Sequence, residues 1–365
     1  EGSVVMSWVE PLGDSEHALK FAVLEQTGWS APREVARGGN WFVNWADFPS
    51  VVPIDENHWA AHWLVKREGG TYSYDVAIAV SEDAGESWSE PVTPHLDDTR
   101  TEHGFVSLFP DGEGFAALWL DGREMSEDPA GGGHASDGEG GMTLRAARIG
   151  FDATLGEQYL IDDLVCECCQ TDAALTRNGI VAVYRDLTTE ELRDVSVARF
   201  SDGQWTPEDS PGAEGWEMSA CPVNGPAVDA SDDRVAAAWF TGADGDRRVR
   251  VSLSEDAGAS FSDPVDIDHD AIGRVDVVTL DDGGAVVSWL ANTDDGAQIR
   301  LRKVNADATL GAEYVVTETT SARSSGFPQM LRNGDDLVIA WTDTGDPSRV
   351  RTAAITGAAG LTPSN

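Results

Sequence analysis

Cysteine is the residue type most concentrated at one point of this sequence. Cys166, Cys168 and Cys169 lie within four residues of one another, and the fourth cysteine is Cys221. Thiolates bind soft metals such as copper(I) and zinc, and pairs of thiols form disulfides. On a strand Cys166 and Cys168 share one face while Cys169 points to the other, so two of the three can face one ligand unless a bulge intervenes. A metal site, two disulfides and inert buried thiols all remain open.

Strands of an internal repeat would bring these cysteines together. An apolar strand that ends in an aromatic residue recurs at intervals of about 50 to 65 residues, the period of a propeller blade. The seven aromatic residues are Trp8, Trp63, Trp119, Tyr184, Trp239, Trp289 and Trp341. We therefore predict an all-β fold, a β-propeller of seven blades with four antiparallel strands each, as a single domain over residues 1–365. A ring of six blades is the alternative.

A shorter strand precedes most of these aromatic strands by about a dozen residues and is predicted to line the central channel. Six such inner strands can be recognised, because the first repeat lacks its own, and the last repeat lacks an outer strand. Ionisable groups at the starts of inner strands are costly to bury unless they are paired or used, so the channel is the predicted site. The candidates at these positions are Asp47, Glu102, His103, the Cys166–Cys169 group, Cys221, Arg274 and Arg323.

The cysteines of two neighbouring repeats would meet at this channel. Cys221 from the following repeat and His103 from the preceding one would complete a soft-metal site with Cys166, Cys168 and Cys169, with copper as the first choice and zinc as the second. The other interpretation is a disulfide from Cys221 to one member of the group, which would join adjacent blades.

Two turns carry a family signature. Residues 81–88 read Ser-Glu-Asp-Ala-Gly-Glu-Ser-Trp, and residues 254–261 read Ser-Glu-Asp-Ala-Gly-Ala-Ser-Phe. Both resemble the Asp box, or BNR repeat, of sialidase-like β-propellers. In such a turn the Asp carboxylate accepts turn amides and the Gly supplies a positive φ, so the motif marks the fold and not the catalytic centre.

The resemblance implies an arginine cluster that clamps a substrate carboxylate, an acid, and a Tyr/Glu nucleophile pair. The matching candidates are Arg274 and Arg323 for the clamp, Asp47 or Glu102 as acid/base, and Tyr184 as the phenol. This chain departs from the family at its first inner strand. Residues 44–49 read Asn-Trp-Ala-Asp-Phe-Pro, where sialidases carry Arg-Ile-Pro.

The charge balance limits the partners. The chain has 64 Asp and Glu against 25 Lys and Arg, which argues against a nucleic acid or an anionic membrane as partner. Such a surface is typical of salt-adapted proteins, and no apolar run is long enough to span a bilayer. We expect an exported, extracytoplasmic monomer that binds a small molecule or glycan. Three functions are carried forward: a soft-metal site with oxidoreductase activity, a sialidase-type glycan hydrolase, and a non-catalytic glycan-binding or scaffold propeller.

Overall fold

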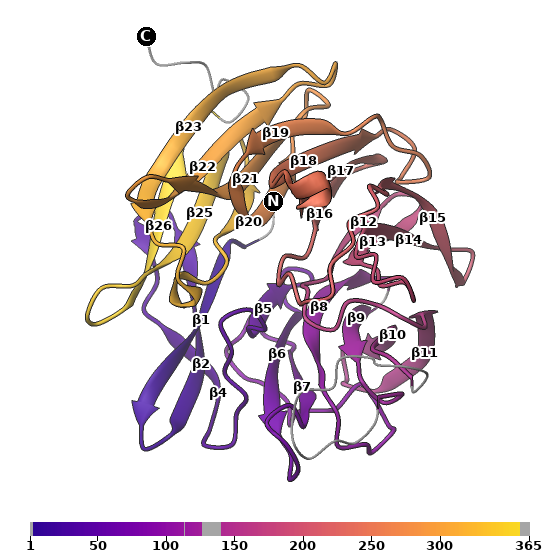
Figure 1. The fold of residues 1–365 in the computed structure, drawn as a ribbon. Coiled ribbons are helices and arrows are strands. Elements are labelled where there is room, and N and C mark those ends of the chain that lie inside the picture. Colours follow the sequence, from indigo (N-terminus) through magenta and orange to yellow (C-terminus); the bar gives the residue numbers. More distant parts are fainter. Residues whose placement is uncertain (1–2, 113, 126–139, 358–365) are drawn as a thin grey trace. The chain divides into compact units, whose positions relative to one another are not determined.

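The structure, a computed structural model, describes residues 3–112, 114–125 and 140–357. The chain forms two compact units, residues 1–167 and residues 168–365. In Figure 1 the first unit runs from indigo to magenta and the second continues to yellow. No helix among the described residues has the length and apolar character that a membrane-spanning helix needs.

The first unit contains three antiparallel sheets. The first sheet comprises β1 (Val5–Gly13), β2 (Glu16–Glu25), β3 (Gly28–Trp29) and β4 (Arg33–Gly38). The second comprises β5 (Ser50–Pro53), β6 (Trp59–Lys66) and β7 (Tyr74–Ser81). The third comprises β8 (His103–Asp111), β9 (Gly114–Asp121), β10 (Thr143–Gly150) and β11 (Leu155–Asp162).

The second unit contains four antiparallel sheets. The first two comprise β12 (Asp172–Thr176), β13 (Gly179–Arg185), β14 (Val195–Ser201) and β15 (Gln204–Gly212), and then β16 (Ala227–Ser231), β17 (Arg234–Thr241), β18 (Arg248–Ser254) and β19 (Val265–His269). The last two comprise β20 (Ala271–Thr279), β21 (Ala285–Thr293), β22 (Gly296–Val304) and β23 (Leu310–Thr319), and then β24 (Gln329–Asn333), β25 (Asp336–Asp343) and β26 (Arg349–Ile355).

These seven sheets are the blades of an all-β, seven-bladed β-propeller, so the predicted fold class and blade number are confirmed. Six inner strands begin near the predicted positions, namely β5, β8, β12, β16, β20 and β24. The described part of the first sheet has no strand before β1, and the last sheet ends at β26, as predicted. Any strand from residues 358–365 lies outside the described part of the chain.

Burial within a blade follows the residue pattern. The second strands are buried along nearly their whole length, as in β9 and β17, because their Ala, Val and Trp side chains lie between neighbouring elements. The third strand β22 alternates between buried and half-buried positions, and the outer strand β23 is mostly half-buried or exposed. A period of two is what one buried sheet face requires.

Both Asp boxes have the same hydrogen bonds. The carboxylate of Asp83 accepts the backbone N–H of Ser87 at 2.8 Å and its hydroxyl at 2.6 Å, and Asp256 accepts the same groups of Ser260 at 2.9 and 2.6 Å. Gly85 has a φ of 79°, and a Cβ there would lie 2.8 Å from the ring of Phe21. The turn therefore needs glycine for its backbone conformation and for close packing.

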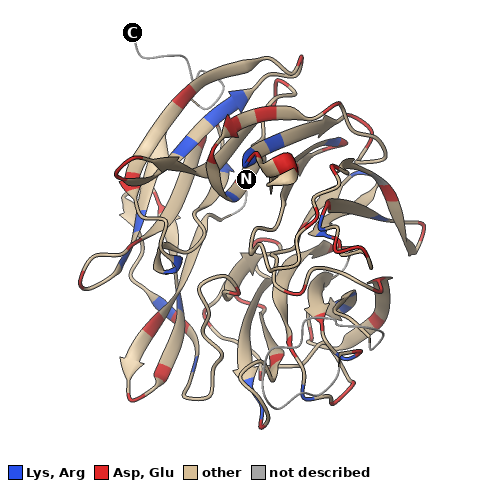
Figure 2. Ribbon diagram, in the orientation of Figure 1, with Lys and Arg blue, Asp and Glu red and all other residues tan. Residues whose placement is uncertain are grey.

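Acidic residues outnumber basic ones in both units. Figure 2 shows Asp and Glu in many of the loops and strand ends, with Lys and Arg at fewer positions. Several of the arginines are paired with these acids, for example Arg332 with Asp281 and Arg33 with Glu86.

Candidate functional site

A phenol and two carboxyl groups meet in the first unit. Asp47 lies in the segment before β5, Tyr74 is the first residue of β7, and Glu102 directly precedes β8. The hydroxyl of Tyr74 lies 3.0 Å from Oδ2 of Asp47 and 2.5 Å from Oε1 of Glu102. The structure thus brings together two of the predicted acid/base residues through a third residue.

The direction of these hydrogen bonds follows from counting protons. A phenol has one proton, so Tyr74 can donate to one carboxyl group only. The other carboxyl group must be protonated and donate to the phenol oxygen, since two carboxylates cannot share one donated proton. The triad of Asp47, Tyr74 and Glu102 therefore holds at least two protons when both hydrogen bonds are made.

Burial decides which carboxyl group keeps its proton. It raises the pKa of Glu102 to about 8, with the charges of Asp47 and Glu167 acting in the same direction. Burial also raises the pKa of Asp47 to about 7, although hydrogen bonds from the Phe105 N–H and from Tyr74 favour its ionised form. Near neutral pH Glu102 is accordingly the protonated member, and the chain of donors runs from Glu102 through Tyr74 to Asp47.

The three side chains of the triad differ in their exposure to solvent. Asp47 is 1% exposed and Tyr74 is fully buried, whereas Glu102 is half-buried. The ring of Phe42 stacks on Tyr74 at 4.0 Å between centroids, and burial together with the two carboxyl groups raises the pKa of Tyr74 well above 10. Glu102 is therefore the most exposed member of the triad, and it is hydrogen-bonded to the buried Tyr74.

Buried carboxyl groups also link neighbouring blades. Asp47 accepts the N–H of Phe105 at 2.8 Å, Asp172 that of Val228 at 2.8 Å, Asp229 that of Thr279 at 2.6 Å and Asp276 that of Met330 at 2.5 Å. In each case the acceptor lies at or before one inner strand and the donor lies in the next. The bond from Asp47 to Phe105 is thus a repeated structural feature, and Asp47 in addition has a hydrogen bond with a phenol, that of Tyr74.

His103 lies in a different group of polar residues from the one predicted. Its Nε2 is 3.2 Å from Asp97 and 3.7 Å from Asp121, and its ring stacks on His95 at 3.8 Å with an angle of 3°. Burial alone would lower the pKa of His103, but the hydrogen bond to Asp97 and the surrounding carboxylates raise it. Within the described residues, the groups of possible metal ligands that include His103 contain acids and a histidine and no cysteine.

Among residues 3–112, 114–125 and 140–357, three groups bring possible metal-ligand atoms within 4.8 Å of one another: Cys166, Cys168 and Cys169; Asp75, His95 and His103; and Asp97, His103 and Asp121. A metal bound to imidazole lies near the ring plane. The two histidine planes are nearly parallel and 3.8 Å apart, so one ion cannot bind both nitrogens unless a ring turns. His103 Nδ1 also lies 3.2 Å from the carbonyl of Tyr74, which ties this group to the triad.

The cysteines differ in disulfide bonding. Cys168 and Cys221 form a disulfide across 53 residues of chain, so the predicted link from the cysteine group to the next blade is present. Cys166 and Cys169 are buried and take no part in that disulfide. While the disulfide persists, Cys168 and Cys221 are not thiolate ligands, and the predicted five-ligand metal set does not exist in this form of the protein.

The predicted clamp arginines have separate surroundings. Arg274 is 5% exposed, and its Nη1 and Nη2 donate to Ser325 Oγ and to the carbonyls of Ser321, Ala322 and Gly326, while burial lowers its pKa to about 10. Arg323 is exposed on the same loop. The contacts of Arg274 support the loop, and a substrate carboxylate would have to replace them.

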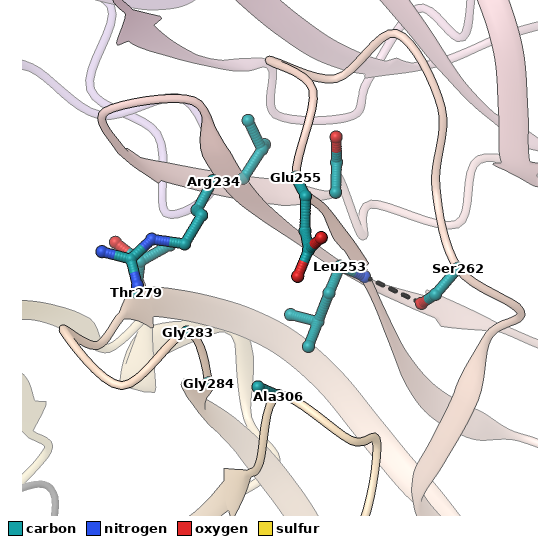
Figure 3. Close-up of a pocket in the computed structure, with 10 residues that line it drawn as sticks. Arg234, Leu253, Glu255, Ser262, Thr279, Gly283, Gly284 and Ala306 are labelled. Atoms are coloured by element: carbon teal, nitrogen blue, oxygen red, sulfur yellow. Dashed lines mark hydrogen bonds between the residues drawn. The ribbon is translucent and has the colours of Figure 1, made fainter.

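A small cavity of about 130 Å³ lies at one edge of the second unit (Figure 3). Arg234 and Glu255 line it together with Leu253, Thr279 and the turn at Gly283 and Gly284. Arg234 donates to the carbonyl of Asp281, and none of the predicted site residues lines the cavity.

Tyr74 is the member of this candidate site that the sequence analysis did not identify. The resemblance to sialidases pointed to Tyr184, which is a buried residue of β13. Tyr74 precedes the alternating strand of its repeat and, unlike Tyr184, does not stand where the other repeats have Trp. That position outside the repeated core pattern was the available signal.

The comparisons with known proteins support the fold. Solved structures similar to this chain include Trypanosoma rangeli sialidase (TM-score 0.53, 13% identity, 90% of this chain and 56% of that one) and leech intramolecular trans-sialidase (TM-score 0.54, 10% identity, 97% and 83%). NanB sialidase from Streptococcus pneumoniae is a third (TM-score 0.51, 8% identity, 93% and 83%). The chain thus spans little more than half the length of the Trypanosoma enzyme. No family model matches the chain, and no curated protein does.

Proposed function

We propose that this protein is a glycan-active hydrolase of the sialidase type that uses Glu102 as its general acid and base. The observation that carries the proposal is the phenol of Tyr74 shared between Glu102 and Asp47. Perturbed pKa values in a hydrogen-bonded group of this kind are typical of catalytic centres. The structural likeness to sialidases favours a glycan as the substrate class.

In this proposal Glu102 donates its proton to the leaving oxygen of the glycosidic bond. A pKa of about 8 keeps the acid protonated near neutral pH, and its partial exposure lets it meet a substrate. The leaving alcohol takes this proton as the glycosidic bond breaks, a water oxygen bonds to the anomeric carbon, and the proton that the water loses returns to the Glu102 carboxylate. Tyr74 and Asp47 are positioning residues, because both are sealed from solvent and act through the hydrogen-bond chain.

The identity of the substrate sugar is to be determined by an assay. The arginine clamp of sialidases is not reproduced by Arg274, whose guanidinium donates to loop oxygens. The assay therefore compares an aryl sialoside with neutral aryl glycosides, in dilute and in concentrated sodium chloride because of the acidic surface. Hydrolysis of any of them supports the class, and the best substrate identifies the sugar.

Matched variants connect the activity to the triad. Glu102→Gln is expected to lower kcat by about 100-fold or more, the usual size of a general acid's contribution. Glu157→Gln, on an exposed position of β11, is the control and should leave kcat unchanged. Folded protein without glycosidase activity on the panel, or an active Glu102→Gln enzyme, would overturn the proposal in favour of a glycan-binding or scaffold propeller.

A second candidate function is the binding of a soft metal by the cysteines. The preferred ion is copper(I), followed by zinc, and the bound ion would carry out redox chemistry. The sulfurs of Cys166, Cys168 and Cys169 lie within 4.8 Å of one another, which favours such a site in protein whose Cys168–Cys221 disulfide has been reduced. Elemental analysis of protein purified without metal-affinity resin, combined with a thiol titration, tests it. We also propose that the protein is extracytoplasmic and monomeric.

A further inference from the structure

One imidazole nitrogen faces two carboxylates inside the first unit. His103 is the first residue of β8 and Asp121 is the last residue of β9, and the two are paired across the strands. Asp97 lies in the connection between β7 and β8. Nε2 of His103 is 3.2 Å from Oδ2 of Asp97 and 3.7 Å from Oδ1 of Asp121. The side chains of His103 and Asp121 are fully buried, and that of Asp97 is 7% exposed.

We propose that these three residues bind one zinc ion, at a site separate from the cysteines. Imidazole nitrogens and carboxylate oxygens are both zinc ligands, at about 2.0 to 2.2 Å from the ion. Two ligand atoms at such distances are about 3.4 Å apart when the coordination is tetrahedral. The observed separations of 3.2 and 3.7 Å lie on either side of this value, so an ion requires only small movements of the side chains. A water molecule would complete the four-coordinate site.

Hydrogen bonds already orient His103 and Asp121. Nδ1 of His103 is 3.2 Å from the carbonyl of Tyr74, and donation to that carbonyl leaves Nε2 to bind an ion. The other oxygen of Asp121, Oδ2, accepts from the indole of Trp119 at 2.7 Å and from Arg123 at 2.6 Å. Arg123 also donates to Oδ1 at 2.8 Å, so an ion would share that oxygen with it. Outer partners of this kind are typical of metal ligands.

His95 orients the third ligand. Its Nδ1 is 3.1 Å from Oδ1 of Asp97, and its Nε2 accepts the backbone N–H of Val76 at 3.4 Å. A ring nitrogen that accepts a hydrogen bond carries no proton, so His95 is neutral and donates through Nδ1. This bond holds Oδ1 of Asp97, while Oδ2 faces His103 and also accepts from the hydroxyl of Thr99. His95 is therefore an outer partner of the site and not a ligand.

The charges of the group favour a divalent ion. Asp75, Asp97 and Asp121 carry three negative charges around His103, and Arg123 supplies one positive charge next to two of them. A single proton added to His103 leaves one negative charge unbalanced, whereas a divalent ion beside neutral His103 balances all of them. Burial makes an unbalanced charge costly. The next charges outward pair with each other, Arg67 with Asp98 and Arg145 with Glu124.

Binding exchanges a proton for the ion. Without metal, Nε2 of His103 donates its proton to Asp97, and the ion takes the place of that proton, which passes to solvent. The ion would then join the connection between β7 and β8 to the ends of both β8 and β9. Glu102 directly precedes His103, so the ion would also fix the backbone beside it. The inference does not depend on glycosidase activity.

The test is a zinc titration of the intact chain with its disulfide in place. Protein stripped with a chelator is titrated by calorimetry in concentrated sodium chloride, which screens weak binding to the acidic surface. We expect one zinc ion per chain and a melting temperature that rises with the zinc concentration. Calcium, which prefers about six to eight oxygen ligands, is the control ion and should have neither effect.

Four variants locate the ion. Asp97→Asn and His103→Gln should each weaken zinc binding by at least about 100-fold, since loss even of an outer partner costs about 10- to 100-fold. Asp98→Asn is the matched control, because this neighbouring side chain is 86% exposed. Asp97 lies outside the strands, so its variant tests the site even if His103→Gln fails to fold. Cys169→Ser should bind zinc as the wild type does.

The alternative results are equally definite. A wild-type chain that binds no zinc would overturn the site and leave His103 as a protonated partner of Asp97. Wild-type affinity in Asp97→Asn would overturn it as well. Loss of zinc in Cys169→Ser alone would assign the ion to the cysteines, and calcium binding as tight as that of zinc would mean that surface carboxylates hold both ions.

Discussion

A Cβ atom added to Gly104 would lie 2.0 Å from Oδ2 of Asp47. The same atom would approach the ring of Tyr74 to 2.9 Å, so the backbone of β8 reaches the triad only because residue 104 has no side chain. Phe105, the next residue, adopts a positive φ of 53° and donates its N–H to Asp47. Asp47, Gly104 and Phe105 therefore form one tightly fitted contact between two neighbouring blades.

The first prediction concerns this contact. Gly104→Ala must displace either the carboxylate or β8, so we expect a lower melting temperature, with a cost of about 1 to 3 kcal/mol, the usual range for overpacking. Glycosidase activity should fall as well, because Tyr74 loses its alignment. Gly39→Ala is the matched control, since a Cβ at Gly39 meets nothing within 4 Å. Equal melting temperatures for the two variants would show that the contact is not tight in solution.

The second prediction is the pH dependence of activity. Ionised Asp47 is the stronger acceptor for the Tyr74 hydroxyl, and its pKa is raised to about 7, whereas Glu102 must be protonated to act as the acid, and its pKa is raised to about 8. Activity should rise with pH through about 7 and fall through about 8, with apparent values that belong to the coupled group. A kcat profile of the wild type and of Tyr74→Phe tests this. Tyr74→Phe removes the hydroxyl that connects Glu102 with Asp47. An unchanged dependence of kcat on pH in this variant would therefore contradict the role of the phenol.

The third prediction is the pH dependence of stability in the second unit. Burial raises the pKa of Asp172 to about 7 and that of Asp276 to about 8, above the value near 3.9 of an unfolded aspartate. The folded chain therefore binds more protons than the unfolded chain between about pH 4 and 8. The contribution of these two groups is complete below about pH 4 and is lost progressively as the pH rises from about 4 through 7 to 8.

The measurement for this prediction is melting temperature against pH. Asp276→Asn can still accept the N–H of Met330 but cannot ionise, so its melting temperature should decline less over this range than that of the wild type. Asp294→Asn, at an exposed position, should follow the wild type. A variant with the wild-type slope would show that Asp276 does not titrate in this window.

The fourth prediction separates two roles of Arg274. Its hydrogen bonds to the loop at residues 321–326 predict that Arg274→Lys loses stability, by about 3 kcal/mol, since hydrogen bonds from a charged group are lost. A substrate clamp predicts a higher KM at unchanged stability instead. Thermal unfolding and steady-state kinetics of the same variant distinguish them, with the exposed Arg349→Lys as control.

Much of the fold could be predicted because a propeller repeats its signals. Seven aromatic residues at nearly constant intervals fix the number of second strands, and the Asp boxes depend on hydrogen bonds within six or seven residues. Residues close together in the sequence are therefore enough to specify such a turn. Asp47, Glu102 and Cys221 could be singled out for the same reason, since the repeat places each of them in the segment that leads into an inner strand.

The partners of those residues were decided by tertiary structure. Whether Cys221 pairs with Cys166, Cys168 or Cys169 depends on side-chain directions at an irregular segment, and a strand's alternation does not determine it. His103 and Arg274 were correctly placed near strand starts, yet their contacts come from loops that no period describes. Tyr74 joins Asp47 and Glu102 across separations of 27 and 28 residues. Sequence periodicity gives the position of a residue along its blade, while the atoms that its side chain contacts depend on how neighbouring blades pack.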